Sequence, residues 1–285
     1  MAHTLYLDQD EIQLSNQNAV LNLVAKNGTT QKIPLTGIKK LVVKGNNTLT
    51  ARLLAKLGAL GIGLIALSGQ QHHPTLMLPN TASDVQLRIQ QILAFQHADI
   101  TFALSQATIN DKIQSQIQAL TVHYAQQAKH RLVIQKTIAQ LKAVQRKLGN
   151  AKQLNHCLGY EGAASRIYFK CLAHLVAPSY GFNHRNIRPP KDPFNVLLSL
   201  SYTLLTSEIA LALHMKGFDP YIGYCHTPLV GRPSLACDLI EPLRAWVDAF
   251  CIQLCTSQTI RSTHFSQNAQ RCILERAGRL NFYEA

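Results

Sequence analysis

The first 80 residues alternate short apolar runs with polar ones, and this pattern predicts a set of β-strands. Ile12 and Leu14 alternate with polar neighbours, as on a strand with one buried face. Asn27-Gly28 lies between two apolar runs, so we expect a type I′ hairpin turn there, leading into a strand at 30–35. The other predicted elements are strands at 19–25, 40–43, 62–67 and 75–78 and a helix at 50–60. Short strands at this spacing predict a small β-sandwich.

From about residue 81 the apolar positions recur every three or four residues, which is the period of an amphipathic helix. Ile113 and Ile117 follow this period, and so do Ile134 and Ile138. Gly149 is a plausible helix stop, and the chain stays helical beyond it. We therefore expect an α+β protein with a small N-terminal β-sandwich domain at 1–80, followed by a larger all-α domain at 81–285.

An irregular, proline-rich segment interrupts the helical pattern at 178–193. It carries aromatic side chains between basic ones, among them Tyr180, His184, Arg185 and Lys191. Such a segment fits a nucleic-acid backbone, but it equally fits a proline-stiffened connection between helices, and the sequence leaves both readings open.

The charge is strongly unbalanced, because 28 Lys and Arg face 15 Asp and Glu and leave a net charge of +13. This favours an anionic partner, either nucleic acid or an acidic membrane surface. The longest apolar run, at 57–68, is too short to span a bilayer and contains glycines, and the N-terminus does not look like a signal peptide. We therefore expect a cytoplasmic protein that binds nucleic acid and no membrane.

All seven cysteines lie after residue 156, and none forms a CxxC pair. An odd number without paired spacing favours reduced thiols in a cytosolic protein. Cys251 and Cys255 are one helical turn apart and precede His264, but a zinc site there lacks the usual paired spacing.

Four acidic or imidazole side chains in the second half of the chain are candidates for chemistry. They are Glu161, His226, Asp238 and Glu241. Asp238 and Glu241 are three residues apart, so on a helix they face the same side and repel unless a cation or an Arg lies between them. Oxygen ligands with one imidazole suit Mg²⁺ or Mn²⁺ better than zinc. Each residue also has a structural reading, such as a Glu that stabilises a helix N-terminus or an acidic pair on a solvated face.

Four ordered blocks give the chain a specific family resemblance. They are EGAASRIYF at 161–169, RPPKDPFNVLLSLSYTLL at 188–205, GFDPYIGYCH at 217–226 and RPSLACDLIEPLR at 232–244. Together they resemble the CRISPR-associated spacer-acquisition integrase, the universal adaptation nuclease of CRISPR–Cas systems. The resemblance extends over nearly the whole chain, more loosely in the N-terminal half through IPLTGIKKLVV at 33–43.

The resemblance implies roles for individual residues. The motif glutamate, the motif histidine and one carboxylate of the last block bind a divalent metal in the family, and by position these are Glu161, His226 and Glu241. Asp238 matches a second acidic position of the block and completes the catalytic set. Structural or DNA-orienting roles are implied for Arg166 and Tyr168, and Asn195 is expected to tie down the loop. The basic side chains expected to contact DNA are Arg166, Arg185, Arg188, Lys191, Arg232 and Arg244.

The resemblance also implies an activity and partners. In the family, the 3′-OH of an incoming spacer fragment attacks a phosphodiester at a CRISPR repeat boundary, and water in its place gives nuclease activity. Homodimers form through the β-rich region, and a small companion adaptation protein bridges two dimers along double-stranded DNA. Three alternatives stay open: a transposon-type integrase, a repair nuclease acting on branched DNA, and a non-catalytic DNA-binding scaffold.

Overall fold

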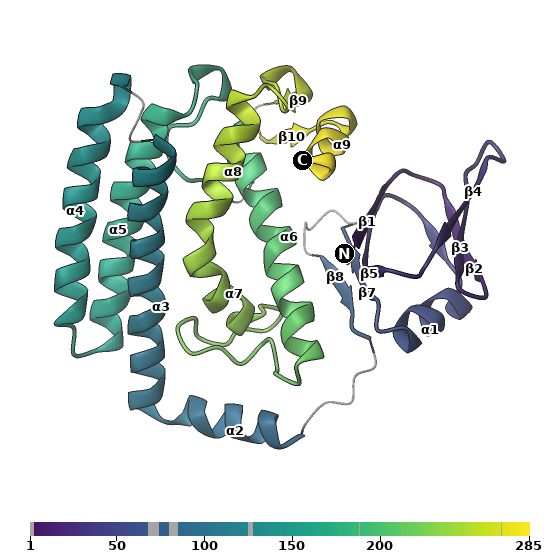
Figure 1. The fold of residues 1–285 in the computed structure, drawn as a ribbon, viewed down its shortest axis with the longest axis horizontal. Coiled ribbons are helices and arrows are strands. Elements are labelled where there is room, and N and C mark those ends of the chain that lie inside the picture. The colour runs from purple at the N-terminus through teal and green to yellow at the C-terminus, as the bar shows by residue number, and fades with distance from the viewer. Residues whose placement is uncertain (1–2, 68–73, 80–84, 125–127, 188, 269) are drawn as a thin grey trace. The chain divides into compact units, whose positions relative to one another are not determined.

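The computed structural model describes residues 3–67, 74–79, 85–124, 128–187, 189–268 and 270–285 (Figure 1). A strand-rich N-terminal region precedes a helical one, which confirms the predicted fold class. Contacts between residues divide the chain into two compact units. One contains the described residues up to Leu87 together with Leu211–Phe218, and the other contains Arg88–Ala210 and Asp219–Ala285.

The described residues of the first unit up to Met77 form two four-stranded sheets and the helix α1. In one sheet the strand order is β1-β5-β7-β8, and in the other it is β4-β3-β2-β6. The elements are β1 (His3–Asp8), β2 (Gln13–Gln17), β3 (Val20–Val24), β4 (Thr30–Pro34), β5 (Ile38–Lys44), β6 (Thr48–Leu49), α1 (Ala51–Ala59), β7 (Gly63–Ala66) and β8 (Thr75–Met77).

One hydrophobic cluster joins the two sheets and α1. Leu14 and Leu21 enter it from one sheet, Leu41 and Leu64 from the other, and Leu53 from α1. All five are buried; β3 alternates buried and half-buried positions, whereas β5 and β7 each have three consecutive buried residues. Shared burial across both sheets makes this unit a small sandwich.

The predicted hairpin lies where expected, but its turn is of another type. The Ala25 N–H donates to the Thr29 carbonyl at 2.9 Å, and the Gly28 N–H donates to the Ala25 carbonyl at 2.9 Å. Gly28 has a φ of +79°, whereas Asn27 does not have a positive φ. A type I′ turn needs positive φ at both central residues, so the prediction is wrong. The three-residue loop is of the kind in which a single left-handed glycine closes the hairpin.

The sequence pattern missed four short or peripheral strands. β1 lies at the end of its sheet, parallel to β5, and β6 is only two residues long. In the helical unit, β9 (Phe265–Gln267) and β10 (Cys272–Leu274) form a two-stranded antiparallel ribbon in a region predicted to be all helical. Strands of two or three residues depend on their partner, so no local alternation announces them.

The second unit is a set of helices around α3, which packs against α4, α5 and α8 (Figure 1). Its helices are α2 (Val85–Gln96), α3 (Ala98–Ala119), α4 (Arg131–Gly149), α5 (Leu154–Leu175), α6 (Pro193–Met215), α7 (Ser234–Ile240), α8 (Arg244–Thr256) and α9 (Arg276–Glu284). α6 runs on into the first unit at its C-terminal end. A π-helical turn extends α3 at Leu120–Tyr124. The 3-10 turn η4 (Glu241–Leu243) joins α7 to α8 and contacts α3.

α6 is the one described helix that is long and apolar enough to cross a membrane by length and composition alone. The sequence analysis considered only the apolar run at 57–68, which lies outside α6. Half of its most apolar window is buried inside the protein, as in the core helix of a soluble protein, so the length and composition of α6 are weak evidence for a membrane span.

Candidate active site

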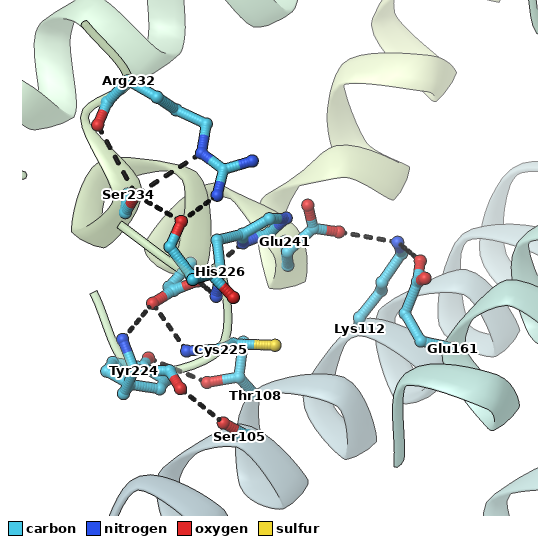
Figure 2. Close-up of polar contacts among 12 residues, drawn as sticks. Ser105, Thr108, Lys112, Glu161, Tyr224, Cys225, His226, Arg232, Ser234 and Glu241 are labelled. Atoms are coloured by element: carbon cyan, nitrogen blue, oxygen red, sulfur yellow. Dashed lines mark hydrogen bonds and ion pairs between the residues drawn. The ribbon is translucent and has the colours of Figure 1, made fainter. Parts of the chain in front are cut away.

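Two of the predicted carboxylates meet at a lysine that the sequence analysis did not select. Lys112 on α3 lies between Glu161 on α5 and Glu241 at the start of η4 (Figure 2). Its ammonium donates a hydrogen bond to Glu161 Oε1 and lies 2.6 Å from Glu241 Oε2. Only 7% of the Lys112 side chain is exposed. One ammonium is therefore shared by two carboxylates that are 80 positions apart in the sequence.

Glu241 is held from both sides. Its Oε1 accepts a hydrogen bond from Arg244 Nε at 2.8 Å, while its Oε2 contacts Lys112. Burial works to raise the pKa of Glu241, but the charges of Lys112 and Arg244 outweigh it, so the pKa is lowered. Oε2 is buried and lies close enough to the Lys112 ammonium for an ion pair. Each oxygen of Glu241 is thus engaged by one cationic side chain.

Asp238 on α7 organises the loop that carries His226. Its Oδ2 accepts the backbone N–H groups of Tyr224 and Cys225 at 2.7 and 3.0 Å. Its Oδ1 accepts the N–H of His226 at 2.9 Å and lies 2.6 Å from His226 Nδ1. The Asp238 side chain is completely buried, whereas that of His226 is 33% exposed. The carboxylate therefore fixes both the loop and the orientation of the imidazole.

Glycine is required where this loop passes Asp238. A Cβ at Gly223 would lie 2.6 Å from Asp238 Oδ2 and 2.7 Å from the backbone carbon of Ser234. Neither neighbour can move, because Asp238 is bonded to the loop and Ser234 begins α7. The glycine of the block at 217–226 thus allows the loop backbone to approach the carboxylate closely.

α3 also anchors the same loop from the other side (Figure 2). Ser105 Oγ donates to the Tyr224 carbonyl at 3.1 Å, and the hydroxyls of Thr108 and Tyr224 are 2.8 Å apart. Lys112 lies one turn further along α3 than Thr108. One helix therefore positions both the histidine loop and the lysine between the two glutamates.

The structure groups one further set of metal-type ligands. Among the described residues, ligand atoms of Cys225, His226 and Asp238 lie within 4.8 Å of one another. Burial raises the pKa of the Cys225 thiol to about 12, and sulfur is a soft ligand that Mg²⁺ and Mn²⁺ do not favour. Asp238 is already bonded to the loop. Among these three, His226 is the residue best suited to reach a metal shared with the glutamates, because its side chain is partly exposed and Asp238 engages only its Nδ1.

A buried polar network supports Arg244. Its guanidinium lies over the Tyr202 ring, 4.5 Å from the centroid, and the Tyr202 hydroxyl donates to Asp248 Oδ1. Arg185 lies over the same ring at 5.6 Å. Glu241 is therefore linked through Arg244 to charged groups deep between α6 and α8.

Asp248 in this network predicts a pH-dependent stability. Burial raises its pKa from 3.8 to about 6, against the hydrogen bond from Tyr202 and the charges of Arg244 and Arg185. The unfolded chain therefore loses the Asp248 proton at a lower pH than the folded protein does, so the free energy of unfolding decreases as the pH rises from 4 to 6. Above pH 6 the decrease amounts to about 3 kcal/mol.

We expect the free energy of unfolding of Asp248→Asn, relative to that of the natural protein, to increase by about 3 kcal/mol as the pH rises from 4 to 7. Urea unfolding at several pH values measures this difference, with Asp99→Asn as the control because Asp99 is exposed on α3. A difference between variant and natural protein that does not change with pH would contradict the prediction.

The predicted DNA-contacting residues fall into two groups. Arg166 on α5 and Lys191 are exposed. Arg232 is half-buried, and its guanidinium donates to the Thr227 carbonyl. Arg188 lies outside the described residues.

Arg185 and Arg244 instead bind inside the protein. Arg185 donates to Asn195 Oδ1 at 2.8 Å and to Ser199 Oγ at 3.1 Å, and Arg244 holds Glu241. These bonds favour a structural role for both guanidinium groups.

Asn195 ties down the proline-rich segment, as expected. Its side-chain amide donates to the His184 carbonyl at 2.9 Å, and its Oδ1 accepts the Asn186 N–H at 3.1 Å. Tyr168 is fully buried on α5, which favours the structural one of its two implied roles. The metal-binding and DNA-binding roles of the selected residues stay predictions, and Lys112 is the site residue that the sequence reasoning missed. Its one signal was a basic residue between the buried positions Thr108 and Gln116.

Comparison with known proteins gives a consistent result. The family model described as CRISPR associated protein Cas1 matches residues 5–285. The CRISPR-associated endonuclease Cas1 1 of Thermodesulfovibrio yellowstonii is 31% identical over 291 residues, which cover 98% of this chain and 89% of the relative.

Two solved structures share the fold. A CAS1 protein from Thermotoga maritima superimposes with a TM-score of 0.86 at 21% identity, covering 99% of this chain and 88% of that one. A chain of a Cas6-RT-Cas1–Cas2 complex gives a TM-score of 0.83 at 26% identity, covering 99% of this chain and 31% of that one.

Proposed function

The chain belongs to the CRISPR associated protein Cas1 family, and from this premise we propose that it inserts new spacer DNA into CRISPR arrays. The 3′-OH of the incoming strand would attack a phosphodiester at a repeat boundary, and with water as the nucleophile the same site would cut DNA. One observation carries the proposal: Glu161 and Glu241, from separate motif blocks, converge on the ammonium of Lys112.

The donor set fits Mg²⁺ or Mn²⁺. Two carboxylates already converge on the ammonium of Lys112, and the charges of Lys112 and Arg244 lower the pKa of Glu241. Asp238 engages Nδ1 of His226, which leaves Nε2 as the ligand nitrogen. Glu161, Glu241 and His226 would hold the ion, and carboxylate oxygens with one imidazole suit these metals.

The chemistry is a transesterification that conserves the number of phosphodiesters. The attacking 3′ oxygen loses its proton and bonds to phosphorus, while the 3′ oxygen of the repeat strand leaves and takes up a proton. A bound dication would supply charge stabilisation for the phosphorane-like transition state and for the leaving oxygen. Asp238 orients the imidazole of His226, and Arg244 holds Glu241 in place.

Double-stranded DNA is the proposed partner, both as the incoming fragment and as the repeat. The net charge of +13 supplies affinity for phosphates without sequence preference. Arg166 and Lys191 are exposed and free to reach the backbone, and Arg232 borders the histidine loop.

We also propose a homodimer formed through residues 1–80 and a small companion protein that bridges two dimers. β4 lies at the end of its sheet with mostly exposed side chains, so its edge can pair with another chain. The similar chain of the Cas6-RT-Cas1–Cas2 complex is assembled with a Cas2 protein, which supports a companion of this kind.

A strand-transfer assay on supercoiled DNA tests the proposed function. We expect a labelled fragment to join a CRISPR leader–repeat in Mg²⁺ or Mn²⁺, and the product to disappear in EDTA because the dication is removed. Transposon ends and branched DNA are the comparison substrates. Strand transfer that persists in EDTA would contradict metal dependence. Preference for transposon ends would favour a transposon-type integrase, and cleavage of branched DNA alone would favour a repair nuclease. DNA binding without any product would favour a non-catalytic scaffold.

A further inference from the structure

Lys112 occupies the position between Glu161 and Glu241 that a shared metal ion would require. Its ammonium is within bonding distance of one oxygen of each carboxylate (Figure 2). A dication binds carboxylate oxygens at about 2.0–2.2 Å, so an ion on these two oxygens would overlap the space that the ammonium fills. Lysine and metal therefore exclude one another at this pair of oxygens.

The charges around Glu161 and Glu241 also indicate that Lys112 and a metal ion exclude one another. Lys112 and Arg244 contribute two positive charges to the cluster, and Glu161 and Glu241 contribute two negative ones. A dication that entered this cluster would be repelled by the Lys112 ammonium. Water screens this repulsion little, because the side chains of Lys112 and Glu241 are buried. Without the lysine charge the cluster would attract the ion.

The ammonium of Lys112 ends a flexible stem and borders a carboxylate that is partly open to solvent. The side chain has a four-carbon stem whose ammonium alone makes the two polar contacts, and Glu161 is 29% exposed on the side that faces solvent. Glu161 Oε1 also keeps the hydrogen bond of Ser165 Oγ at 2.8 Å, so this carboxylate stays oriented when the ammonium departs.

We propose that Lys112 is a built-in competitor for the metal, which holds Glu161 and Glu241 together until a divalent ion displaces its ammonium. This inference rests on the proposed metal site and adds a residue that sets its affinity. Lys112 is a positioning residue here, since it acts on the metal ligands and not on the reacting atoms.

Calorimetric titration of the full chain with MnCl₂ tests the competition. We expect Lys112→Met, which keeps the stem and removes the charge, to bind Mn²⁺ at least about tenfold more tightly than the natural protein. Lys112→Arg keeps the charge and should bind no more tightly than the natural protein. Lys142→Met is the control for a general loss of positive charge, because Lys142 is exposed on α4, and it should change the affinity less than about twofold.

Unchanged or weaker Mn²⁺ binding by Lys112→Met would overturn the inference while leaving the metal site intact. Absence of Mn²⁺ binding in the natural protein and in every variant would overturn the metal site together with the inference. These two failures are therefore distinguishable.

Thermal unfolding adds a second readout. Lys112→Met leaves two carboxylates close together, so its Tm in EDTA should be lower than that of the natural protein, and saturating Mn²⁺ should close the gap. A gap that persists in Mn²⁺ would show that the ion does not replace the lysine.

The natural protein gives a test that needs no variant. Amine-reactive labelling followed by mass spectrometry should modify Lys112 slowly in EDTA and at least about threefold faster in Mn²⁺, while Lys142 reacts equally in both. Equal labelling of Lys112 with and without Mn²⁺ would overturn the displacement, even if Lys112→Met failed to fold.

Discussion

Glu241→Gln is expected to lower strand transfer by about 10²–10³-fold while DNA affinity changes little. Glutamine keeps the volume of the side chain but removes the charge that faces Lys112 and Arg244. A metal would lose one of its two carboxylate ligands, and the developing charge on phosphorus would lose its stabilisation. Initial rates in the strand-transfer assay and DNA binding by fluorescence anisotropy measure the two effects separately.

Glu161→Gln should behave in the same way, because Glu161 is the other carboxylate on the shared cation. The matched control is Glu284→Gln, the same chemical change on an exposed side chain at the end of α9. It should transfer strands at the natural rate. Full activity in either site variant would remove that carboxylate from the metal site, and equal loss in the control would point to a general effect of charge.

Asp238→Asn is expected to lower strand transfer by about 10–100-fold and to destabilise the protein by about 2–4 kcal/mol. Asp238 is completely buried and accepts three backbone N–H groups in addition to facing His226 Nδ1. An asparagine offers one oxygen and directs its NH₂ at groups that are themselves donors. Thermal unfolding and the strand-transfer rate measure the two effects.

A double variant separates positioning from bulk stability. If Asp238 acts through the imidazole, then Asp238→Asn should add little to the loss in activity already caused by His226→Ala, although it should still lower the Tm. Losses in activity that simply multiply would mean that Asp238 and His226 contribute independently. A fully active Asp238→Asn would contradict the orienting role of this carboxylate.

Much of the fold follows from local patterns. Alternation placed β2 and β3, whose buried Leu14 and Leu21 form the sandwich core, and the helical period placed α3 and α4. These predictions succeed because a side-chain period of two or 3.6 residues reports directly which face of an element is buried. β9 and β10 escaped because they are three residues long and depend on pairing with each other, whereas β1 escaped although Leu5 and Leu7 alternate along it and pack against the core.

The candidate site was predictable only as a set of residue types. Its four acidic and imidazole members lie in recognisable blocks, as does Arg244, but Lys112, the ammonium between two of them, does not. Lys112 is about 50 positions from Glu161 and carries no motif, and its importance arises from the packing of α3 against α5 and η4. Arg185 and Arg244 were expected to contact DNA because they are basic, yet both guanidinium groups lie over the ring of Tyr202 inside the protein.

The sequence by itself determined the strand-rich and helical regions, the family, and the carboxylates and imidazole available for a metal. The tertiary structure alone decided which charges compensate one another: Lys112 with two glutamates, Asp238 with the histidine loop, and Arg244 with Glu241. The reason is physical. Periodicity and motifs are properties of neighbouring residues, whereas the energy of a buried charge depends on groups that folding brings within a few ångströms from distant parts of the chain.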